Sequence, residues 1–284
     1  MSNGCFFNLA AHLFRYTGNT TYFATADKTF SWMQKIGFID SKTWAIYDGG
    51  HVQNNCTDIN KAQFTYPSAL ILQGAAFIYN QVSVAPNPCS RLIVSNTMDE
   101  QQTGGNSPVW KTNLDNLLDA ILKYSFKDGV AFEPACETGG RCTSDMTAFK
   151  GYLLRFLGTT AQVAPYTRDK IKSLVTSTAK AAAAHCSGGS SGRACGFSWL
   201  ESESRKSNAT TDGLGEQLTS LAAVESLLFF DASGPVTNAT KDSAPAAAGG
   251  GGGGGKPGGG NPSGAGKLEM GSLMMVAGLF FLFL

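Results

Sequence analysis

Residues 132–157 read FEPACETGGRCTSDMTAFKGYLLRFL, and this stretch decides how the rest of the chain is interpreted. Its second half is predicted to be a helix, because the apolar residues recur there at helical spacing. These residues are Phe149, Leu153, Phe156 and Leu157. Thr143 or Ser144 is expected to cap the helix, with Asp145 in its first turn, where the helix dipole favours a negative charge.

The first half of the same stretch is an acidic loop between two cysteines. Glu133 and Glu137 flank Cys136, and Cys142 follows a Gly-Gly turn. A helix that begins straight after such a loop presents the loop at its end. Loop ends of this kind commonly form sites, so the stretch is the first candidate for a functional region.

Composition narrows the class of protein. The chain has 284 residues, of which 43% are hydrophobic, so it can bury a substantial core. Its formal net charge is +1 and no basic patch stands out, which argues against a nucleic-acid partner. Because no phosphate loop, Ser-His-Asp arrangement or metal-ligand cluster is recognisable, we expect neither a cofactor nor a metal.

The cysteines and glycosylation sequons indicate a secreted protein. Four Asn-x-Ser/Thr sequons predict N-glycosylation at Asn19, Asn55, Asn208 and Asn238. Among seven cysteines, the spacings Cys136–Cys142 and Cys186–Cys195 predict local disulfides, with zinc ligation as the alternative. One cysteine among Cys5, Cys56 and Cys89 is then left over.

The C-terminal part predicts a tether. Residues 233–266 are interpreted as a linker, and the run 244–266 is almost entirely Gly, Ala, Pro and Ser. Residues 267–284 end in an apolar tail that is short for a membrane span, which is typical of a GPI-anchor signal. Ser263 is the expected attachment residue, and a tail-anchored helix is the alternative. The start of the chain does not read as a signal peptide, so we expect an N-terminal portion to be missing.

Helices dominate the remaining residues 1–232, which we interpret as one domain. They are expected at residues 1–16, 21–36, 66–81, 109–126, 167–185 and 213–230, besides the helix of the opening stretch. In the first of these, the predicted core face is Phe6, Leu9, Ala10, Leu13 and Phe14. A small hairpin is expected between residues 38–40 and 44–47, closed by Asp48-Gly49-Gly50. Paired helices with long loops predict an all-α toroid or array rather than a tight bundle.

An ordered set of motifs resembles the C-terminal half of the fungal mannan endo-1,6-α-mannosidases, glycoside hydrolase family 76. The motifs are Ser2-Asn3-Gly4, Leu13-x-Arg15-Tyr16-Thr17-Gly18-Asn19, Asp48-Gly49, Gly74-Ala75-Ala76, Phe132-Glu133-x-x-Cys136-Glu137, Cys142-x-x-Asp145, Phe149-Lys150-Gly151 with Arg155, and Cys195-Gly196-x-x-Trp199. The resemblance covers about residues 2–200. It implies an (α/α)6 barrel, here incomplete at the N-terminus, that binds α-1,6-mannan or GPI-linked mannan glycans.

The resemblance also implies a catalytic pair of adjacent aspartates in the other half of the family's fold. No Asp-Asp pair occurs in this sequence, so no catalytic residue is assigned. A second departure is Pro67 after Tyr66, where the family usually has Asn. The residues carried over as substrate-binding are Asn3, Asp48, Tyr66, Glu133, Glu137, Asp145 and Lys150.

Individual residues leave alternatives open. Glu133, Glu137 and Asp145 could supply the two carboxyl groups of a glycosidase. The simpler interpretation makes Asp145 a helix-start charge and pairs Glu137 with Lys150 or Arg141. The preferred interpretation is that these groups line or support a sugar cleft. Asp48 is either a turn former or a sugar contact. The four tryptophans are expected to pack in the core rather than to stack on sugars.

Two functions follow from the sequence. The first is a mannan endo-1,6-α-mannosidase or wall transglycosidase, GPI-anchored at the outer face of the plasma membrane and in the cell wall, whose truncated chain is itself inactive. The second is a non-catalytic, GPI-anchored mannan-binding wall protein. Hydrolysis and transfer use the same carboxyl pair, so the sequence does not separate them. Half a toroid should also leave apolar helix faces open to water.

Overall fold

A computed structural model describes residues 2–84, 108–200 and 213–241. The described helices all belong to one compact unit, Met1–Ala239. The expected apolar tail, Ser263, Asn208 and Cys89 lie outside the described residues. Within the described part of the chain, no helix combines the length and apolarity that a membrane crossing requires.

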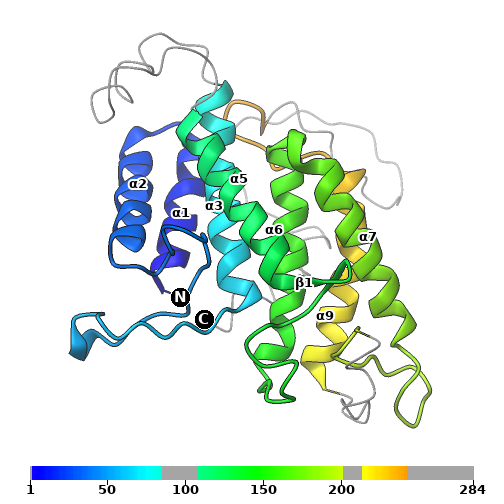
Figure 1. Cartoon of the computed structure of the whole chain (residues 1–284). Helices are drawn as coiled ribbons and strands as arrows, with labels where there is room; N and C mark the ends of the chain where they lie inside the picture. Colours follow the sequence, from blue (N-terminus) through cyan, green and yellow to red (C-terminus); the bar gives the residue numbers. More distant parts are fainter. Residues whose placement is uncertain (1, 85–107, 201–212, 242–284) are drawn as a thin grey trace, which may run out of the picture. The chain divides into compact units, whose positions relative to one another are not determined.

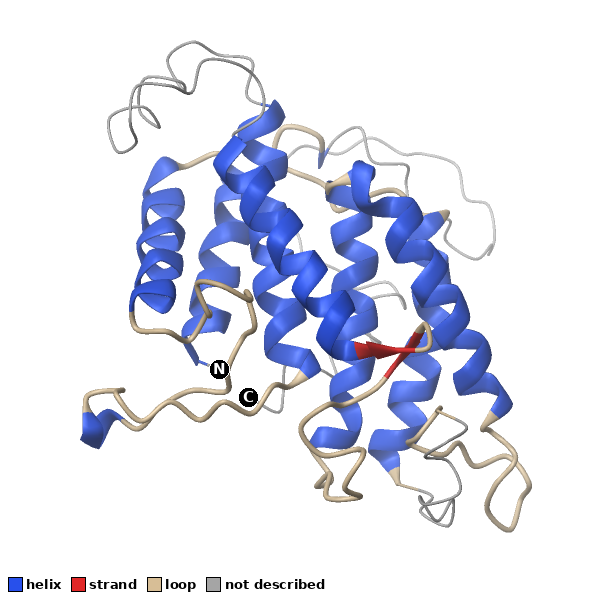
Figure 2. Ribbon diagram, viewed as in Figure 1, coloured by secondary structure: helices blue, strands red, loops and turns tan. Residues whose placement is uncertain are grey.

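Helices make up most of the unit, and the predicted ones are all present with ends shifted by a few residues (Figures 1 and 2). They are α1 (Ser2–Thr17), α2 (Thr20–Lys35), α3 (Thr65–Val84), α5 (Pro108–Ser125), α6 (Phe149–Val163), α7 (Arg168–Ala184) and α9 (Leu214–Glu225). Short 3-10 turns are η1 (Val52–Asn54), η2 (Met146–Ala148), η3 (Pro165–Thr167) and η4 (Ser226–Phe230). The all-α class is therefore confirmed.

The helices form two rows. Helices α1, α3, α6 and α9 pack against one another in chain order. Helix α2 packs on α1, α5 on α3, and α7 on both α6 and α9, so the second row covers the first (Figure 1). The rows meet through large apolar side chains, for example where Phe7 of α1 lies 5.3 Å from Phe30 of α2 and 6.2 Å from Trp110 of α5, measured between ring centroids. Closure of these rows into a six-fold barrel stays a prediction.

One two-stranded ribbon was not predicted. Strand β1 (Phe126–Lys127) pairs antiparallel with β2 (Val130–Ala131), and Phe126 lies opposite Ala131. The two-residue turn between them has positive φ at both Asp128 (53°) and Gly129 (76°). An Asp-Gly turn with this backbone matches the twist of a hairpin, so the signal was present in the sequence. The predicted hairpin at residues 38–47 is present as one antiparallel bridge between Ile39 and Ile46, flanked by backbone hydrogen bonds from Tyr47 to Phe38 and from Asp40 to Ala45.

The predicted core face of α1 is partly wrong. Phe7 and Ala11 are buried with Ala10 and Phe14, whereas Phe6 and Leu9 are 54% and 57% exposed. The error has a physical cause, because α1 is apolar on two sides and its neighbours α2 and α3 cover only one. Helix α9, at the other end of the row, also has exposed apolar residues. They are Leu214, Leu221 and Val224, followed by Leu228 in η4.

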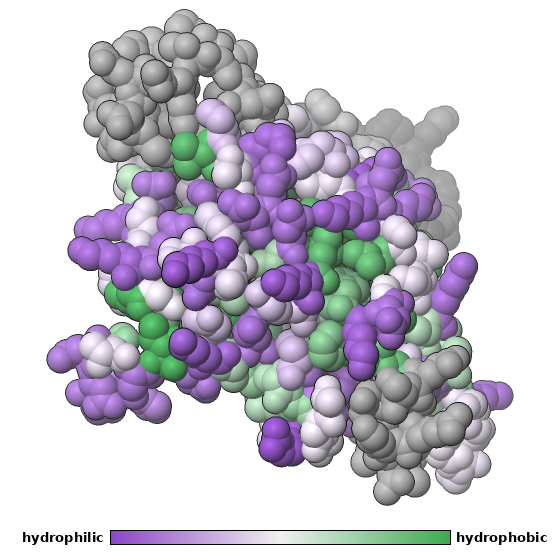
Figure 3. Space-filling view, in the orientation of Figure 1, coloured by the Kyte–Doolittle hydropathy of each residue, from purple (hydrophilic) through white to green (hydrophobic). Residues whose placement is uncertain are grey.

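The side of the molecule seen in Figure 3 is largely hydrophilic, with apolar side chains gathered in smaller patches. The exposed apolar residues of α1 and α9 instead recur at helical spacing on the two end helices of one row. This agrees with the expectation of open apolar faces.

The folded unit includes the start of the predicted linker. Arg15 of α1 donates to the carbonyl oxygens of Pro235 at 2.7 Å and Val236 at 3.3 Å, and its Nε donates to Asn80 of α3 at 2.9 Å. The backbone N–H of Asn238 donates to the Tyr16 carbonyl at 2.9 Å. These hydrogen bonds therefore hold the segment after η4 against the C-terminal ends of α1 and α3.

Candidate functional site

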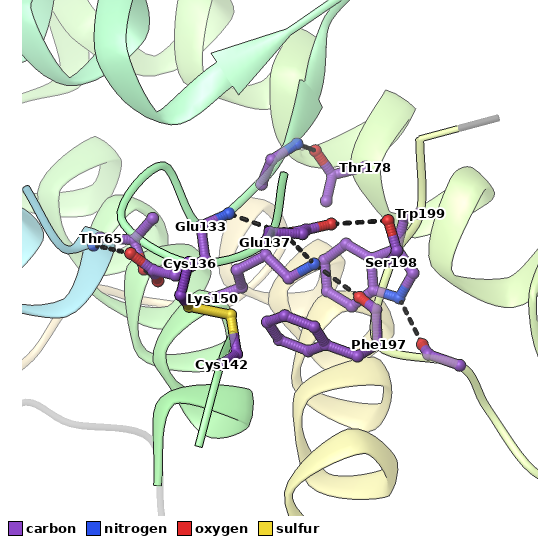
Figure 4. A network of polar contacts seen from close by, with 12 residues as sticks. Thr65, Glu133, Cys136, Glu137, Cys142, Lys150, Thr178, Phe197, Ser198 and Trp199 are labelled. Atoms are coloured by element: carbon purple, nitrogen blue, oxygen red, sulfur yellow. Dashed lines mark hydrogen bonds and ion pairs between the residues drawn. A yellow bond between two sulfur atoms is a disulfide. The ribbon is translucent and has the colours of Figure 1, made fainter. Parts of the chain in front are cut away.

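Four segments of the chain meet around Lys150 in the first turn of α6 (Figure 4). They are the N-terminal end of α3, the loop 132–142, the beginning of α6 and the segment 197–199. Figure 4 shows their polar side chains pointing toward one another between the helices. We call the set Thr65, Glu133, Glu137, Lys150 and Ser198 the buried polar network.

Lys150 is fully buried, at 0% exposure. Its ammonium donates to Glu137 Oε2 at 3.0 Å and to the carbonyl oxygen of Phe197 at 2.6 Å. The rings of Phe197 and Trp199 each lie 4.0 Å from Nζ, measured to the ring centroid. Burial lowers the pKa of Lys150, and the neighbouring Glu137 carboxylate opposes that shift. A buried ammonium is tolerated only when it is paired and hydrogen-bonded, as it is here.

Glu137 receives three hydrogen bonds from three segments. Its Oε2 accepts from Lys150 and from the backbone N–H of Glu133 at 2.7 Å, and its Oε1 accepts from Ser198 Oγ at 2.8 Å. The carboxylate thus joins its own loop to α6 and to the 197–199 segment. Of the two ion-pair partners considered from the sequence, the structure shows Lys150.

The Glu133 side chain caps the N-terminal end of α3 by accepting hydrogen bonds from Thr65. Its Oε1 accepts from the Thr65 backbone N–H at 2.9 Å, and its Oε2 accepts from Thr65 Oγ1 at 2.6 Å. The side chain therefore satisfies one of the free N–H groups at the helix start. Burial is the largest influence on its pKa, which rises to about 7 despite the hydrogen bonds from Thr65 and the nearby Lys150.

Both disulfides predicted from spacing are present, namely Cys136–Cys142 and Cys186–Cys195. The first closes the loop that carries Glu137, so it limits how far that carboxylate can move from Lys150. Cys5 and Cys56 are free thiols. In the described ranges, no group of three His, Cys, Asp or Glu side chains is placed to hold a metal ion.

The predicted start of the opening helix is wrong. The chain first makes the 3-10 turn η2, and α6 begins at Phe149 after Ala148, which provides no side-chain cap. The Thr143 hydroxyl donates a hydrogen bond to the exposed carboxylate of Asp145, so neither Thr143 nor Asp145 caps α6. The cause is local, because the Thr147 hydroxyl and N–H bind the carbonyl oxygens of residues 144 and 143 and hold the turn.

The three candidate carboxylates have unlike environments. Glu133 and Glu137 are buried and engaged in the network, while Asp145 is exposed before η2. The observed contacts favour a supporting role for Glu133, Glu137 and Lys150. Direct contact of these groups with a sugar stays a prediction.

The other predicted substrate residues lie elsewhere. Asn3 is half-buried in the first turn of α1. Asp48 lies in the loop before α3, where its Oδ2 accepts from Asn60 Nδ2 at 3.1 Å. Tyr66 follows Thr65 at the start of α3, and its ring is half-buried. Burial raises the pKa of the Tyr66 phenol above its ordinary value.

Three predicted glycosylation residues are described. Asn19 caps α2, its Oδ1 accepting from the Thr21 N–H at 2.9 Å. Asn55 has a left-handed backbone, with φ of 51°. Asn238 lies in the segment after η4, where its backbone N–H donates to the Tyr16 carbonyl of α1. Glycosylation at these residues stays a prediction.

Sequence reasoning missed two members of the network. Thr65 and Ser198 contact carboxylates that lie 68 and 61 residues away in the chain. No local pattern marks them, since Thr and Ser occur throughout the sequence. Trp199 was part of a recognised motif and is buried, as expected for a packing residue.

Comparison with known proteins gives consistent matches. The model for glycosyl hydrolase family 76 matches residues 1–85 and 97–239. Mannan endo-1,6-alpha-mannosidase DFG5 of Saccharomyces cerevisiae is 36% identical over 236 residues, covering 83% of this chain and 46% of that protein. A putative mannan endo-1,6-alpha-mannosidase of Schizosaccharomyces pombe is 40% identical over 232 residues, covering 80% and 46%. The chain thus spans about half the length of the curated relatives it matches.

Comparison with solved structures agrees with the family match. Dfg5 from Chaetomium thermophilum, solved in complex with glucosamine, aligns with a TM-score of 0.71 and 44% identity over 84% of this chain and 53% of that one. An alpha-1,6-mannanase from Salegentibacter sp. aligns with a TM-score of 0.52 at 16% identity, over 77% of this chain and 55% of that one, and shows similarity of fold alone.

Proposed function

Because this chain belongs to glycosyl hydrolase family 76, we propose that it is one half of a mannan endo-1,6-α-mannosidase or wall transglycosidase that acts on α-1,6-mannan in the fungal cell wall. The observation that carries this proposal is the family match over nearly the whole folded unit, together with relatives named for that activity. Activity and substrate are properties of proteins about twice as long, so they apply to this chain as a proposal.

Catalysis in this proposal needs groups from outside the sequence. Glycoside cleavage uses two carboxyl groups that flank the scissile bond. The resemblance implies adjacent aspartates for that role, and no Asp-Asp pair occurs here. In this proposal, the chain supplies a rigid side of the substrate-binding cleft. The buried polar network holds the start of α3, the disulfide-closed loop and α6 in fixed relation.

The apolar faces at the two ends of the α1–α3–α6–α9 row fit the same proposal. Phe6 and Leu9 on α1, and Leu221 and Val224 on α9, are the surfaces that further helices of an (α/α)6 barrel would cover. The proposal also includes a GPI anchor attached near Ser263, which would hold the protein at the plasma membrane and in the wall.

A second candidate function is a non-catalytic mannan-binding wall protein. The specific observation in its favour is the lack of an Asp-Asp pair in a chain that otherwise matches the family. Both candidates predict binding of α-1,6-mannan, and they differ only in chemistry.

The experiment measures binding and cleavage with the same full chain. Titration calorimetry with α-1,6-mannooligosaccharides should show binding, and a reducing-end assay should show no hydrolysis. The part of a family relative that this chain does not match is then added. Cleavage should be restored if the chain is half of an enzyme, and nothing should change if the chain is a binding protein. Clear hydrolysis by the chain alone would contradict the assignment of catalysis to the other half.

A further inference from the structure

The segment after η4 has no regular secondary structure, yet side chains of the neighbouring helices hold it. Residues 231–238, which we call the C-terminal strap, contain neither helix nor strand (orange in Figure 1). Gln162 in the last turn of α6 donates from Nε2 to the carbonyl oxygens of Ala232 and Ser233, at 3.3 Å each. The same Nε2 donates to the carbonyl oxygen of Phe229 in η4 at 2.9 Å. The first half of the strap is therefore bound to α6.

Arg15 in the last turn of α1 binds the second half of the strap. Its Nη2 donates to the carbonyl oxygen of Pro235 at 2.7 Å, and its Nη1 donates to that of Val236 at 3.3 Å. Its Nε donates to Asn80 Oδ1 of α3 at 2.9 Å, and Asn80 Nδ2 in turn donates to the Val163 carbonyl oxygen of α6 at 2.8 Å. One guanidinium thus joins the strap to the C-terminal ends of α1, α3 and α6.

The Arg15 guanidinium is a buried cation whose acceptors are all neutral. The residue is 7% exposed, and burial lowers its pKa. In the described part of the chain, no carboxylate pairs with it. A cation in this position is stabilised by the carbonyl groups at helix C-terminal ends, which carry partial negative charge. The strap adds two further carbonyl oxygens, so opening the strap removes two of the three acceptors of a charged group.

The hydrogen bonds of the strap follow one another in the order in which a pull from the C-terminus would meet them. The folded unit ends at Ala239. The bond from the Asn238 N–H to the Tyr16 carbonyl comes first, the bonds of Arg15 come next, and those of Gln162 come last. Tension on the following residues therefore reaches η4 and α9 only after all these bonds have opened.

Helix α9 is poorly placed to resist such tension by itself. It is the end helix of its row and packs on α6 and α7, while its side chains Leu221 and Val224 are exposed. It also has only 12 residues. Helices of this length are stable mainly through their packing on other elements. If η4 were pulled away from α6, α9 would therefore separate and unfold.

We propose that the C-terminal strap is a clamp, which keeps tension on the C-terminal sequence from reaching η4 and α9. Arg15 is its central residue, because charge-assisted hydrogen bonds are stronger than neutral ones. Tension arises where the C-terminus is attached to a surface, so the role of the clamp in the cell rests on the proposed anchor. The simpler alternative is that the strap only covers the ends of the helices.

Magnetic tweezers test the clamp on the full chain. One handle is attached at the C-terminus and the other at Lys180, an exposed residue of α7, so that α1, α3 and α6 are not pulled directly. The measured quantity is the lifetime, at constant force, of the folded state before η4 and α9 extend. The variants are Arg15→Lys, which keeps the charge but loses the planar fork, and Gln162→Leu. Gln53→Leu is the matched control, because Gln53 is exposed in η1.

We expect each strap variant to shorten this lifetime about tenfold, since each loses hydrogen bonds that hold the strap. Gln53→Leu should leave the lifetime unchanged. Without force, hydrogen exchange of α9 should be the same in all variants, because its packing on α6 and α7 is intact. Equal lifetimes in the wild type and both folded strap variants would overturn the clamp. Faster exchange of α9 without force would also overturn it, since the strap would then be a packing element. If Arg15→Lys does not fold, Gln162→Leu decides alone.

The proposed anchor is tested separately from the clamp. Treatment of intact cells with phosphatidylinositol-specific phospholipase C releases a protein whose C-terminus carries a GPI lipid. No release, together with the tenfold effect in the tweezers, would remove the anchor from the proposed function and leave the clamp. Release of the protein, together with equal lifetimes in the tweezers, would leave the anchor and overturn the clamp.

Discussion

Replacement of Lys150 by methionine tests whether the buried polar network stabilises the fold. Methionine keeps most of the side-chain volume and its apolar contacts, so little cavity is created. What is lost is the ammonium that binds Glu137 at 3.0 Å and the Phe197 carbonyl at 2.6 Å, both away from water. Glu137 would keep only its bonds from the Glu133 N–H and the Ser198 hydroxyl.

The expected magnitude follows from burial. Removal of one partner from a buried ion pair costs about 3–5 kcal/mol, because the remaining charge is left uncompensated. Total stabilities are about 5–15 kcal/mol, so Lys150→Met should lose a large part of the free energy of unfolding. With a urea m-value of about 3 kcal/mol/M, the midpoint of unfolding should fall by about 1 M or more.

The assay is urea unfolding followed by far-UV circular dichroism at neutral pH. The double variant Lys150→Met with Glu137→Gln removes both charges, and it should be more stable than Lys150→Met alone by about 1–2 kcal/mol. Asp119→Asn is the matched control, because its ion pair with Lys170 is exposed and should contribute less than about 1 kcal/mol. The reasoning is refuted if Lys150→Met changes stability no more than this control, or if the double variant is no better than the single one.

Three other predictions concern neighbouring features. Folding raises the pKa of Glu133 from 4.5 to about 7, so the folded state binds this proton more tightly than the unfolded state does. The protonated Glu133 therefore contributes fully to stability below about pH 4.5, and this contribution is lost as the pH rises toward 7. Stability measured against pH should therefore decline less over this range in Glu133→Gln than in the wild type, and equal slopes would contradict the assignment. Replacement of both Cys136 and Cys142 by serine opens a short loop and should cost about 2 kcal/mol in urea unfolding, whereas no loss would mean that the loop is held without the bond. In Gly158→Ala the new methyl carbon would lie 2.7 Å from the Phe229 ring, so a loss of about 1–3 kcal/mol in thermal unfolding is expected, and an unchanged midpoint would show that α6 and η4 separate easily.

Local patterns in the sequence were sufficient for the helices and the disulfides. The spacing of apolar residues located α3 and α5 to within a few residues, because helix formation depends on neighbours three and four positions apart. The short separations of Cys136–Cys142 and Cys186–Cys195 likewise made those bonds predictable. The Asp128-Gly129 turn is predictable in principle, since both residues tolerate positive φ.

Other features depended on which segments meet in space. Helix α1 is apolar on two sides, and only the positions of α2 and α3 decide that Phe7 is buried while Phe6 is exposed. The partners of Glu133 and Glu137 in Thr65 and Ser198 are more than 60 residues away, and nothing local distinguishes these hydroxyls from others in the chain. The sequence alone thus determined the helices, the two disulfides and the family. The tertiary structure decided that Glu133 and Glu137 of the acidic loop are buried and hydrogen-bonded to α3, α6 and Ser198, because burial and long-range hydrogen bonding arise only when distant segments pack together.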